Sequence, residues 1–358
     1  MEFSPGAAEP DQQCVQHREL LGEFTEWSAH ATPASTGRSV ADNCLRLPPP
    51  PALNCHGRGA GPVPSVGGRG HGTTWKGCSM SMVENATRNG VGIPEAEKPK
   101  EYVFDQTWDR ESERLRTNEA IWDPGTIERL ERIGVTEGWS ALEVGAGSGS
   151  ITGWLADRVG PRGRVMAVDL ETSRLDWLRG TPNVEAVTLD LRHEELPAAA
   201  FDVVHARMVV QHLEDRAGAI ARLVRAVKPG GVLFLEDTDS LPLFRSAVAE
   251  DFLADVKAAG YGLMRRSGHE PRGGHFDLEA VLAQGLEEVS AEGRAVMVHG
   301  GSRQARHYML WLESLRPRLL AEGLLEEARI EEALREMADP GNRWLTQVLI
   351  STVGRRPR

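Results

Sequence analysis

The stretch with the clearest chemical potential is an acid followed by three closely spaced glycines, within SALEVGAGSGSITGWLADRVG at residues 140–160. Glu143 stands two residues before Gly145, and Gly147 and Gly149 follow at alternate positions. Glycine has no Cβ, so it adopts positive φ easily and lets a ligand approach the main chain. An apolar run precedes the glycines and an amphipathic run follows them, which predicts a strand, a tight turn and a helix. The sequence therefore predicts a turn that faces a nucleotide-type ligand.

The glycine spacing discriminates between nucleotide ligands. Dinucleotide-binding folds carry GxGxxG, whereas here Ser150 takes the place of the third glycine, which falls at position 149 instead. This spacing disfavours NAD. An acid just ahead of the turn suits a ligand with an ammonium group and a sulfonium, and S-adenosylmethionine has both. A Rossmann-type NAD(P)-dependent oxidoreductase and a non-catalytic binding protein of the same fold stay as alternatives.

The segment LEVGAGSGS resembles the first motif of class I S-adenosylmethionine-dependent methyltransferases, and four later segments resemble the motifs that follow it in that family. The resemblance runs from about residue 101 to 239 and looks closest to small-molecule enzymes of quinone biosynthesis and natural-product synthesis. It implies transfer of a methyl group from S-adenosylmethionine to an oxygen, carbon or nitrogen nucleophile of a small molecule. After the predicted fourth strand stands ARMVVQHL, without the motifs by which DNA methyltransferases grip or attack a flipped base, which favours a small acceptor.

The resemblance also implies which residues hold the cofactor. Asp169, at the end of the second predicted strand, would accept hydrogen bonds from both ribose hydroxyls. Asp190, at the end of the third, would accept one from the adenine amino group, and the main chain near Ala206 would meet the methionine end. The implied cofactor-binding residues are Glu143, Gly145, Ala146, Gly147, Gly149, Asp169, Leu170, Asp190, Leu191, Ala206 and Arg207.

The candidates for catalysis are histidines, and no metal site is expected beside them. In-line methyl transfer gains roughly 7–11 kcal/mol from orientation, against roughly 3–5 kcal/mol from a general base. A base is therefore needed for a hydroxyl acceptor and optional for an activated carbon. His212, just beyond the predicted fourth strand, and His307, in a late helical run beside Tyr308, are the candidate bases or substrate anchors. Asp237 and Asp239 end the predicted fifth strand, where open α/β sheets place ligands.

A parallel sheet is the element that brings these residues together. Strand-like segments alternate with helical or turn segments, which predicts parallel βαβ units. These segments are residues 140–145, 164–169, 184–190, 202–208 and 232–237. Two later strand-like pieces, 286–298 and 346–354, frame a helical run from Gln304 to about Met337. We expect an α/β, Rossmann-like class I methyltransferase sheet, mainly parallel with an antiparallel last strand, and a helical cap inserted between the last two strands.

The sequence also predicts an aromatic helical segment before the sheet and two places where a helix is interrupted or ends. A helical segment at 100–135 carries Tyr102, Phe104 and Trp108, which would close over the cofactor, and its Asp-Pro-Gly at 123–125 predicts a break. KPGG, residues 228–231, predicts a helix end before the fifth strand. Residues 136–240 would then form the cofactor-binding core, and 241–358 the cap and last strands.

The composition of the chain limits what can be expected of its solubility, its partners and its N-terminal region. The chain has 358 residues, a formal charge of −11 and 40% hydrophobic residues, which predicts a soluble, cytoplasmic protein without nucleic-acid or membrane partners and leaves its oligomeric state open. Residues 1–99 are rich in glycine and proline and are expected to be disordered, with Met80 or Met82 as an alternative natural start. All four cysteines lie there. The spacing of Cys55, His56, His71 and Cys78 argues against a zinc site.

Overall fold

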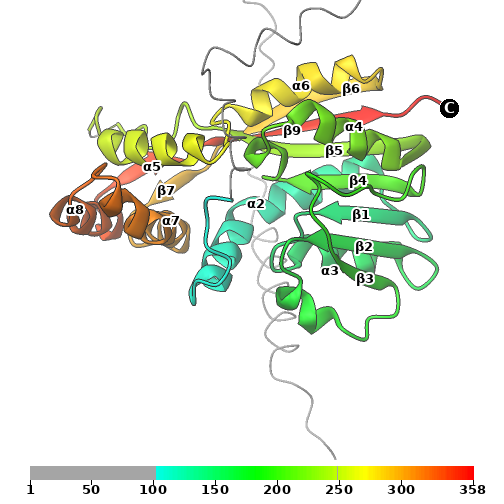
Figure 1. Cartoon of the computed structure of the whole chain (residues 1–358), viewed down its shortest axis with the longest axis horizontal. Coiled ribbons are helices and arrows are strands. Elements are labelled where there is room, and N and C mark those ends of the chain that lie inside the picture. The colour runs from blue at the N-terminus through cyan, green and yellow to red at the C-terminus, as the bar shows by residue number, and fades with distance from the viewer. Residues whose placement is uncertain (1–101, 248) are drawn as a thin grey trace, which may run out of the picture. The chain divides into compact units, whose positions relative to one another are not determined.

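The computed structural model describes residues 102–247 and 249–358, so the expected disordered extension and the cysteine and histidine residues weighed as zinc ligands lie outside the described residues. In the described part, seven strands form one sheet in the order β3-β2-β1-β4-β5-β9-β6 (Figure 1). Their bounds are β1 Ser140–Val144, β2 Arg164–Asp169, β3 Val184–Thr188, β4 Phe201–Arg207, β5 Val227–Asp239, β6 Glu287–Arg294 and β9 Val348–Arg355.

The direction of the strands confirms the expected α/β fold. Strands β1 to β5 pair in parallel, whereas β9 runs antiparallel to both β5 and β6. The chain winds outward from β1 to β3, then returns to place β4 on the other side of β1. Ligands of open α/β sheets bind beyond the carboxyl ends of the strands at such a reversal. The fold therefore places a binding crevice where β1 and β4 end.

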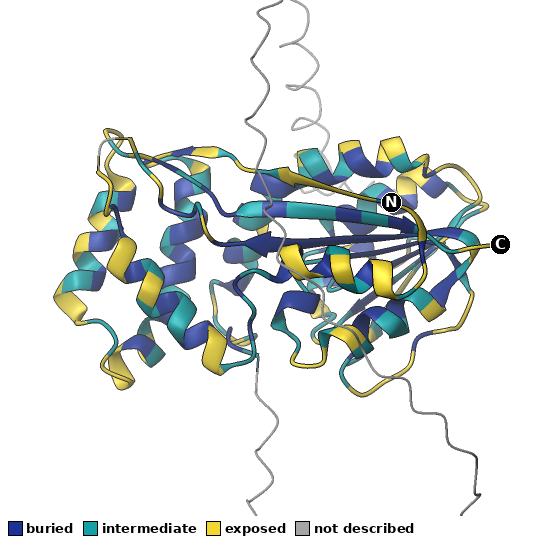
Figure 2. Ribbon diagram, turned by 90° about the horizontal axis from the view of Figure 1, so that it is seen from above, coloured by how far each residue is buried: buried dark blue, intermediate teal, exposed yellow. Residues whose placement is uncertain are grey.

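Helices cover both faces of the sheet, because successive side chains of a strand point to opposite faces. Ala141 of β1 packs with α2 (Glu111–Ile133) and α3 (Ser150–Val159), and the next residue, Leu142, packs in the cluster that includes α4 (Arg216–Ala226) and α6 (Gly273–Ala283). Figure 2 shows the resulting layers, in which buried strands lie between helices whose outward faces are exposed. This rigid support fixes the strand ends that carry the site.

Two expectations about the helical segment at residues 100–135 are wrong, as helix α2 shows. It begins only at Glu111, so Tyr102 and Phe104 lie in a non-helical segment before it, and it continues without a break through residues 123–125. Pro124 lacks an N–H for the helical ladder, but the helix is held on both sides of it by the buried side chains of Trp122 and Thr126. Tertiary packing thus overrides the local break signal.

The KPGG segment also differs from expectation. Helix α4 ends at Ala226, and β5 begins at Val227, so residues 228–231 lie inside the span of the strand. The register between β4 and β5 shifts between Phe201 and Val203 at this point, and Gly230 has φ 77°. The glycines therefore serve a strand irregularity, which needs the left-handed conformation, rather than a helix end.

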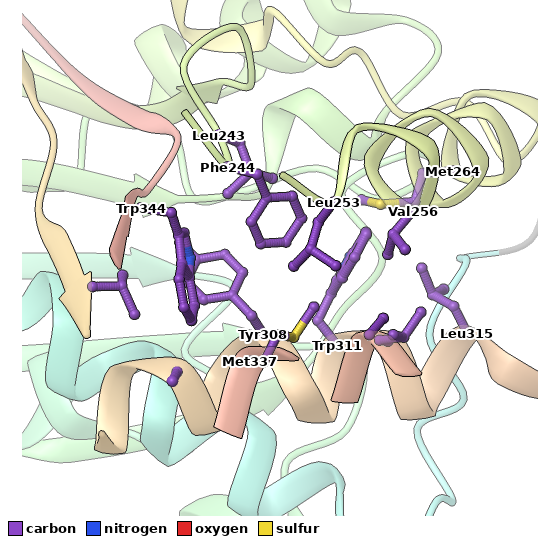
Figure 3. Packing of buried hydrophobic residues seen from close by; sticks show 14 of the residues in the cluster. Leu243, Phe244, Leu253, Val256, Met264, Tyr308, Trp311, Leu315, Met337 and Trp344 are labelled. Atoms are coloured by element: carbon purple, nitrogen blue, oxygen red, sulfur yellow. The ribbon is translucent and has the colours of Figure 1, made fainter. Parts of the chain in front are cut away.

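The expected cap between the last two strands is confirmed. It consists of β7 (Met297–His299), α7 (Arg303–Ala321), α8 (Glu327–Ala338) and β8 (Arg343–Leu345), and α5 (Ala254–Arg266) joins it from the segment after β5. Figure 3 shows how Trp311 and Trp344 pack with Phe244 in its interior. Ile121 and Trp122 of α2 belong to the same apolar cluster, so α2 connects the cap to the sheet. None of the helices described here is both long and apolar enough for a bilayer crossing.

Candidate active site

The glycine turn lies at the carboxyl end of β1 and has the backbone that the sequence predicts. Gly145, Gly147 and Gly149 have φ of 73°, 60° and 86°, all in the left-handed region that favours glycine. A Cβ at Gly147 would meet no atom closer than ordinary van der Waals distance, the nearest side-chain atoms being Leu115 Cδ2 at 3.9 Å and Glu119 Oε1 at 4.0 Å. The turn therefore presents bare main chain to the crevice, as a cradle for a nucleotide-type ligand requires.

A cavity of about 220 Å³ opens above this turn. Its wall is built by the ends of β1, β2 and β4, by the segment after β3, by α2 and by the cap. The expected cofactor-binding residues that line it are Glu143, Gly145, Ala146, Gly147, Asp169, Leu170, Asp190, Leu191 and Arg207. Two others are not brought to it: Gly149 caps the start of α3, and Ala206 is buried within β4.

Two carboxylates stand at the ends of neighbouring strands. Asp169 ends β2, and its Oδ2 accepts a hydrogen bond from the Gly147 N–H at 2.8 Å, which couples the acid to the glycine turn. Burial raises the pKa of Asp169, although its main-chain hydrogen bonds oppose the shift. Asp190 lies two residues beyond β3 and pairs with the Arg192 guanidinium at 2.7 Å, which lowers its pKa. Both acids can accept hydrogen bonds from hydroxyl or amino groups of a ligand.

Glu143 is buried beneath the turn, where its Oε2 accepts a hydrogen bond from Thr152 Oγ1. Burial raises its pKa to about 8, against the opposing effect of that hydrogen bond. Of the basic side chains of β4, His205 has its Nδ1 3.8 Å from Glu143, and Arg207 is already engaged, because it donates to Asp123 at 2.7 Å and to Thr126 at 2.8 Å. A cationic group of a ligand would therefore stabilise the ionised form of Glu143.

The opposite part of the cavity is aromatic. The His212 ring centroid lies 5.1 Å from that of Tyr102, 6.2 Å from Phe104 and 4.7 Å from His269. Tyr261 and Met264 of α5 and Trp311 of α7 also line this part, whereas Trp108 does not. The sequence does not mark these three, because their helical spacing is that of ordinary core residues and only long-range packing places them at the cavity.

Both candidate histidines line the cavity as neutral imidazoles. Burial, and secondarily the charge interaction with His269, holds the pKa of His212 well below its usual value. Burial and Arg114 lower the pKa of His307 to about 3, and its Nδ1 lies 3.4 Å from the Arg114 carbonyl oxygen. Tyr308 does not line the cavity, but it donates to Gln347, which does, at 2.8 Å. A neutral imidazole can accept a proton near neutral pH.

The two acids of β5 are not brought to the cavity. Asp237 is buried, accepts from the Gln211 N–H at 2.7 Å and faces Asp277 of α6. Asp239 accepts from the Leu241 N–H at 2.8 Å. Asp237 therefore supports the segment after β4, and Asp239 supports the segment after β5. In the same described part of the chain, no cluster of three or more histidine, cysteine or acidic side chains is arranged to hold a metal ion.

Comparisons with known proteins agree with this geometry. The family described as "Methyltransferase domain" matches residues 142–235. The chain is 32% identical over 174 residues to a ubiquinone biosynthesis O-methyltransferase of Paracidovorax citrulli, covering 46% of this chain and 67% of that protein. It is 35% identical over 108 residues to a trans-aconitate 2-methyltransferase of Azoarcus sp., covering 30% of this chain and 42% of that protein.

A solved structure with a similar arrangement is a phosphoethanolamine N-methyltransferase 2 of Haemonchus contortus in complex with S-adenosyl-L-methionine. It has a TM-score of 0.43 and 19% identity, and covers 69% of this chain and 57% of that one. Across the curated relatives first matched, the chain spans from a third to two thirds of their length. The matching domain, the strand order and the relative covered over two thirds of its length show that this chain belongs to the class I S-adenosylmethionine-dependent methyltransferases.

Proposed function

We propose that this chain transfers the methyl group of S-adenosylmethionine to a nucleophilic atom of a small molecule. The observation that carries the proposal is a single cavity with two unlike parts, a bare glycine turn flanked by acids and an aromatic part under the cap. Two relatives are named for methyl transfer to small molecules, which supports a small acceptor here. A cytoplasmic location and a role in secondary metabolism are finer parts of the same proposal.

The chain's own residues would hold the cofactor at the end of the sheet. Glu143 would bind the ammonium group, and Asp169 the ribose hydroxyls, while the Gly147 main chain leaves room for the ligand. Asp190, with Leu191 beside it, would bind the adenine. Bound S-adenosylmethionine supplies an electrophilic methyl group on its sulfonium.

The aromatic part would orient the acceptor and exclude water. Tyr102, Phe104 and Trp311 offer apolar faces, and His212 lies between the first two rings and His269. Orientation of the acceptor supplies most of the rate. Where the acceptor is a hydroxyl, His212 would take its proton as the new bond forms.

The two alternatives make different predictions. A nicotinamide-dependent oxidoreductase is not favoured, because the chain belongs to a methyltransferase family and its glycine spacing departs from GxGxxG. A non-catalytic binding protein would bind the cofactor without turnover across acceptors. A screen with methyl-labelled S-adenosylmethionine against phenols, quinols, amines and carboxylates separates it from an enzyme.

Calorimetry with S-adenosylhomocysteine tests the proposed cofactor site. Gly147→Ala should weaken binding at least about tenfold, because its new methyl group projects into the cavity. Gly180→Ala is the matched control, since Gly180 also has a positive φ but faces no atom within 4 Å. Both variants bear the same kind of backbone strain, roughly 1–2 kcal/mol, so only the site distinguishes them. Absence of binding by the unaltered protein would refute the proposed function.

A further inference from the structure

The charged groups on the cavity wall are not evenly balanced. Three of its four arginines are ion-paired with an acid at 2.7 Å: Arg114 with Glu111, Arg192 with Asp190, and Arg207 with Asp123. The fourth, Arg174, donates to the side chain of Gln106 at 2.9 Å. Glu119 and Glu143 have no lysine or arginine within 4.0 Å among residues 102–247 and 249–358, and neither does Asp169. Glu119 and Glu143 therefore lack a directly paired cationic side chain, a place that a cationic group of a ligand can take.

Glu119 reaches this turn from a different element than Glu143 does. It lies on α2, and its Oε1 accepts a hydrogen bond from the Ser148 N–H at 3.2 Å. The same oxygen lies 4.0 Å from the position that a Cβ at Gly147 would take. Glu143 lies at the end of β1, two residues before the turn begins. The two carboxyl groups thus border one stretch of bare main chain.

We propose that Glu119 is a second carboxylate for the cationic end of the cofactor, and that it releases a proton to solvent when the sulfonium form binds. This inference rests on the proposed function. S-adenosylmethionine carries one more positive charge than S-adenosylhomocysteine, because methyl transfer leaves the electron pair of the broken S–C bond on sulfur. Both ligands carry the ammonium group that Glu143 would bind, so Glu119 is the acid that distinguishes the methyl donor from the spent product.

The surroundings of the two groups support a proton change in the neutral range. Burial, and next the charge of Asp123, raises the pKa of Glu119 to about 7. Burial raises that of Glu143 to about 8. The groups that oppose these shifts are the arginines at 116 and 207, the Ser148 N–H and the Thr152 hydroxyl, while His205 Nδ1 lies 3.8 Å from Glu143.

These pKa values determine the direction in which ligand binding changes with pH. Below pH 7 Glu119 holds its proton, and the sulfonium charge favours its loss, so the preference for the sulfonium form grows as the pH rises through about 7. One linked proton changes affinity by at most about tenfold per pH unit. The proton of Glu143 is linked to the ammonium group of either ligand, so it does not change this preference. After methyl transfer the extra charge is gone and Glu119 takes up its proton again. The product is then held less tightly than the donor.

Titration calorimetry of the full chain with each ligand, from pH 6 to 9, tests the inference. The preference for S-adenosylmethionine over S-adenosylhomocysteine should grow as the pH rises through about 7, and buffers of different ionisation heats at pH 6.5 should reveal more proton release with the sulfonium ligand than with S-adenosylhomocysteine. Glu119→Gln should flatten the pH dependence of the preference while S-adenosylhomocysteine binding persists. Glu131→Gln, exposed on the same helix, should leave it unchanged.

Failure of the inference about Glu119 and failure of the proposed function give different results in this experiment. A preference that does not vary with pH in the unaltered protein, or a Glu119→Gln variant with the unaltered pH dependence, overturns the role of Glu119 and leaves the methyltransferase assignment intact. Failure of the unaltered protein to bind either ligand overturns the proposed function instead. Because the first measurement uses the unaltered chain, it decides the matter even where a variant does not fold.

Discussion

Arg207 Nη2 donates to Asp123 Oδ1 at 2.7 Å, and this ion pair joins the end of β4 to the middle of α2. The pair forms at the residue before Pro124, where the local sequence predicts that the helix breaks. Asp123→Ala leaves a largely buried guanidinium without its acid and should lower the free energy of unfolding by about 3 kcal/mol, measured by urea denaturation. Glu137→Ala removes the exposed pair with Arg162 and should cost less than about 1 kcal/mol. Equal losses would contradict this account.

Two glycines of α5 make a matched pair for the packing of the cap. A Cβ at Gly260 would overlap the Trp311 ring, whereas one at Gly262 would meet no atom within 4 Å. Gly260→Ala should therefore destabilise the protein by about 1–3 kcal/mol. Gly262→Ala should stabilise it by about 0.5–1 kcal/mol, because alanine favours the helix. Thermal unfolding of the two variants measures the difference, and stabilisation by both would show that Trp311 does not pack there.

The buried carboxyl groups of Asp237 and Asp277 should make stability depend on pH. Burial, and next the neighbouring carboxyl group, raises the pKa of Asp277 to about 9, and burial raises that of Asp237 to about 7, with Arg216 opposing both shifts. The unfolded chain releases these protons near pH 4, so their contribution to stability is complete below that pH and is lost as pH rises through the folded values.

Asp277→Asn should flatten this decline, because an amide can donate to Asp237 at every pH. We expect a melting temperature close to that of the unaltered protein at pH 5 and higher than it at pH 9. Glu279→Gln, exposed on the same helix, should keep the original slope. An undiminished slope in Asp277→Asn would exclude the pair as its source.

The loss of turnover that His212→Ala causes should depend on the chemical type of the acceptor atom. With a hydroxyl acceptor, His212→Ala should lower turnover by about 10²–10⁴-fold while S-adenosylhomocysteine affinity is maintained. With an activated carbon or a neutral amine, the loss should be less than about tenfold. Since burial holds the pKa of His212 well below 6.5, its protonation should not reduce the rate between pH 8 and 6.5. His193→Ala, on an exposed histidine, is the control, and unchanged turnover of a hydroxyl acceptor by His212→Ala would remove this role.

The glycine turn and the acids at the strand ends could be predicted because their signals are local. The strand, turn and helix around Gly147 follow from adjacent residues, and the acids after β2 and β3 stand beside strand ends that the sequence also marks. Glu119 carried no such signal, since one acid on a charged helix is normally a solvated residue. Its position depends on the packing of α2 against the turn.

The aromatic part of the cavity and the burial of the β5 acids could not be predicted without the long-range structure. The sequence places Asp237 and Asp239 just at the end of a strand, but β5 continues through both and pairs with β9, where Asp237 lies opposite Ile350 and Asp239 opposite Val348. Such pairing across more than a hundred residues has no local signature, and it buries the acids. The same limit applies to Tyr261 and Trp311, which meet at the cavity from separate helices.

The two ends of the insertion between β6 and β9 pair with each other as strands. Strands β7 and β8 pair antiparallel, with Val298 opposite the buried Trp344, so the chain leaves the region of the sheet and returns to it at adjacent points. A segment with adjoining ends can be replaced by another of different length without moving the strands that flank it. The insertion can therefore differ in length or sequence while the sheet and its glycine turn keep their positions.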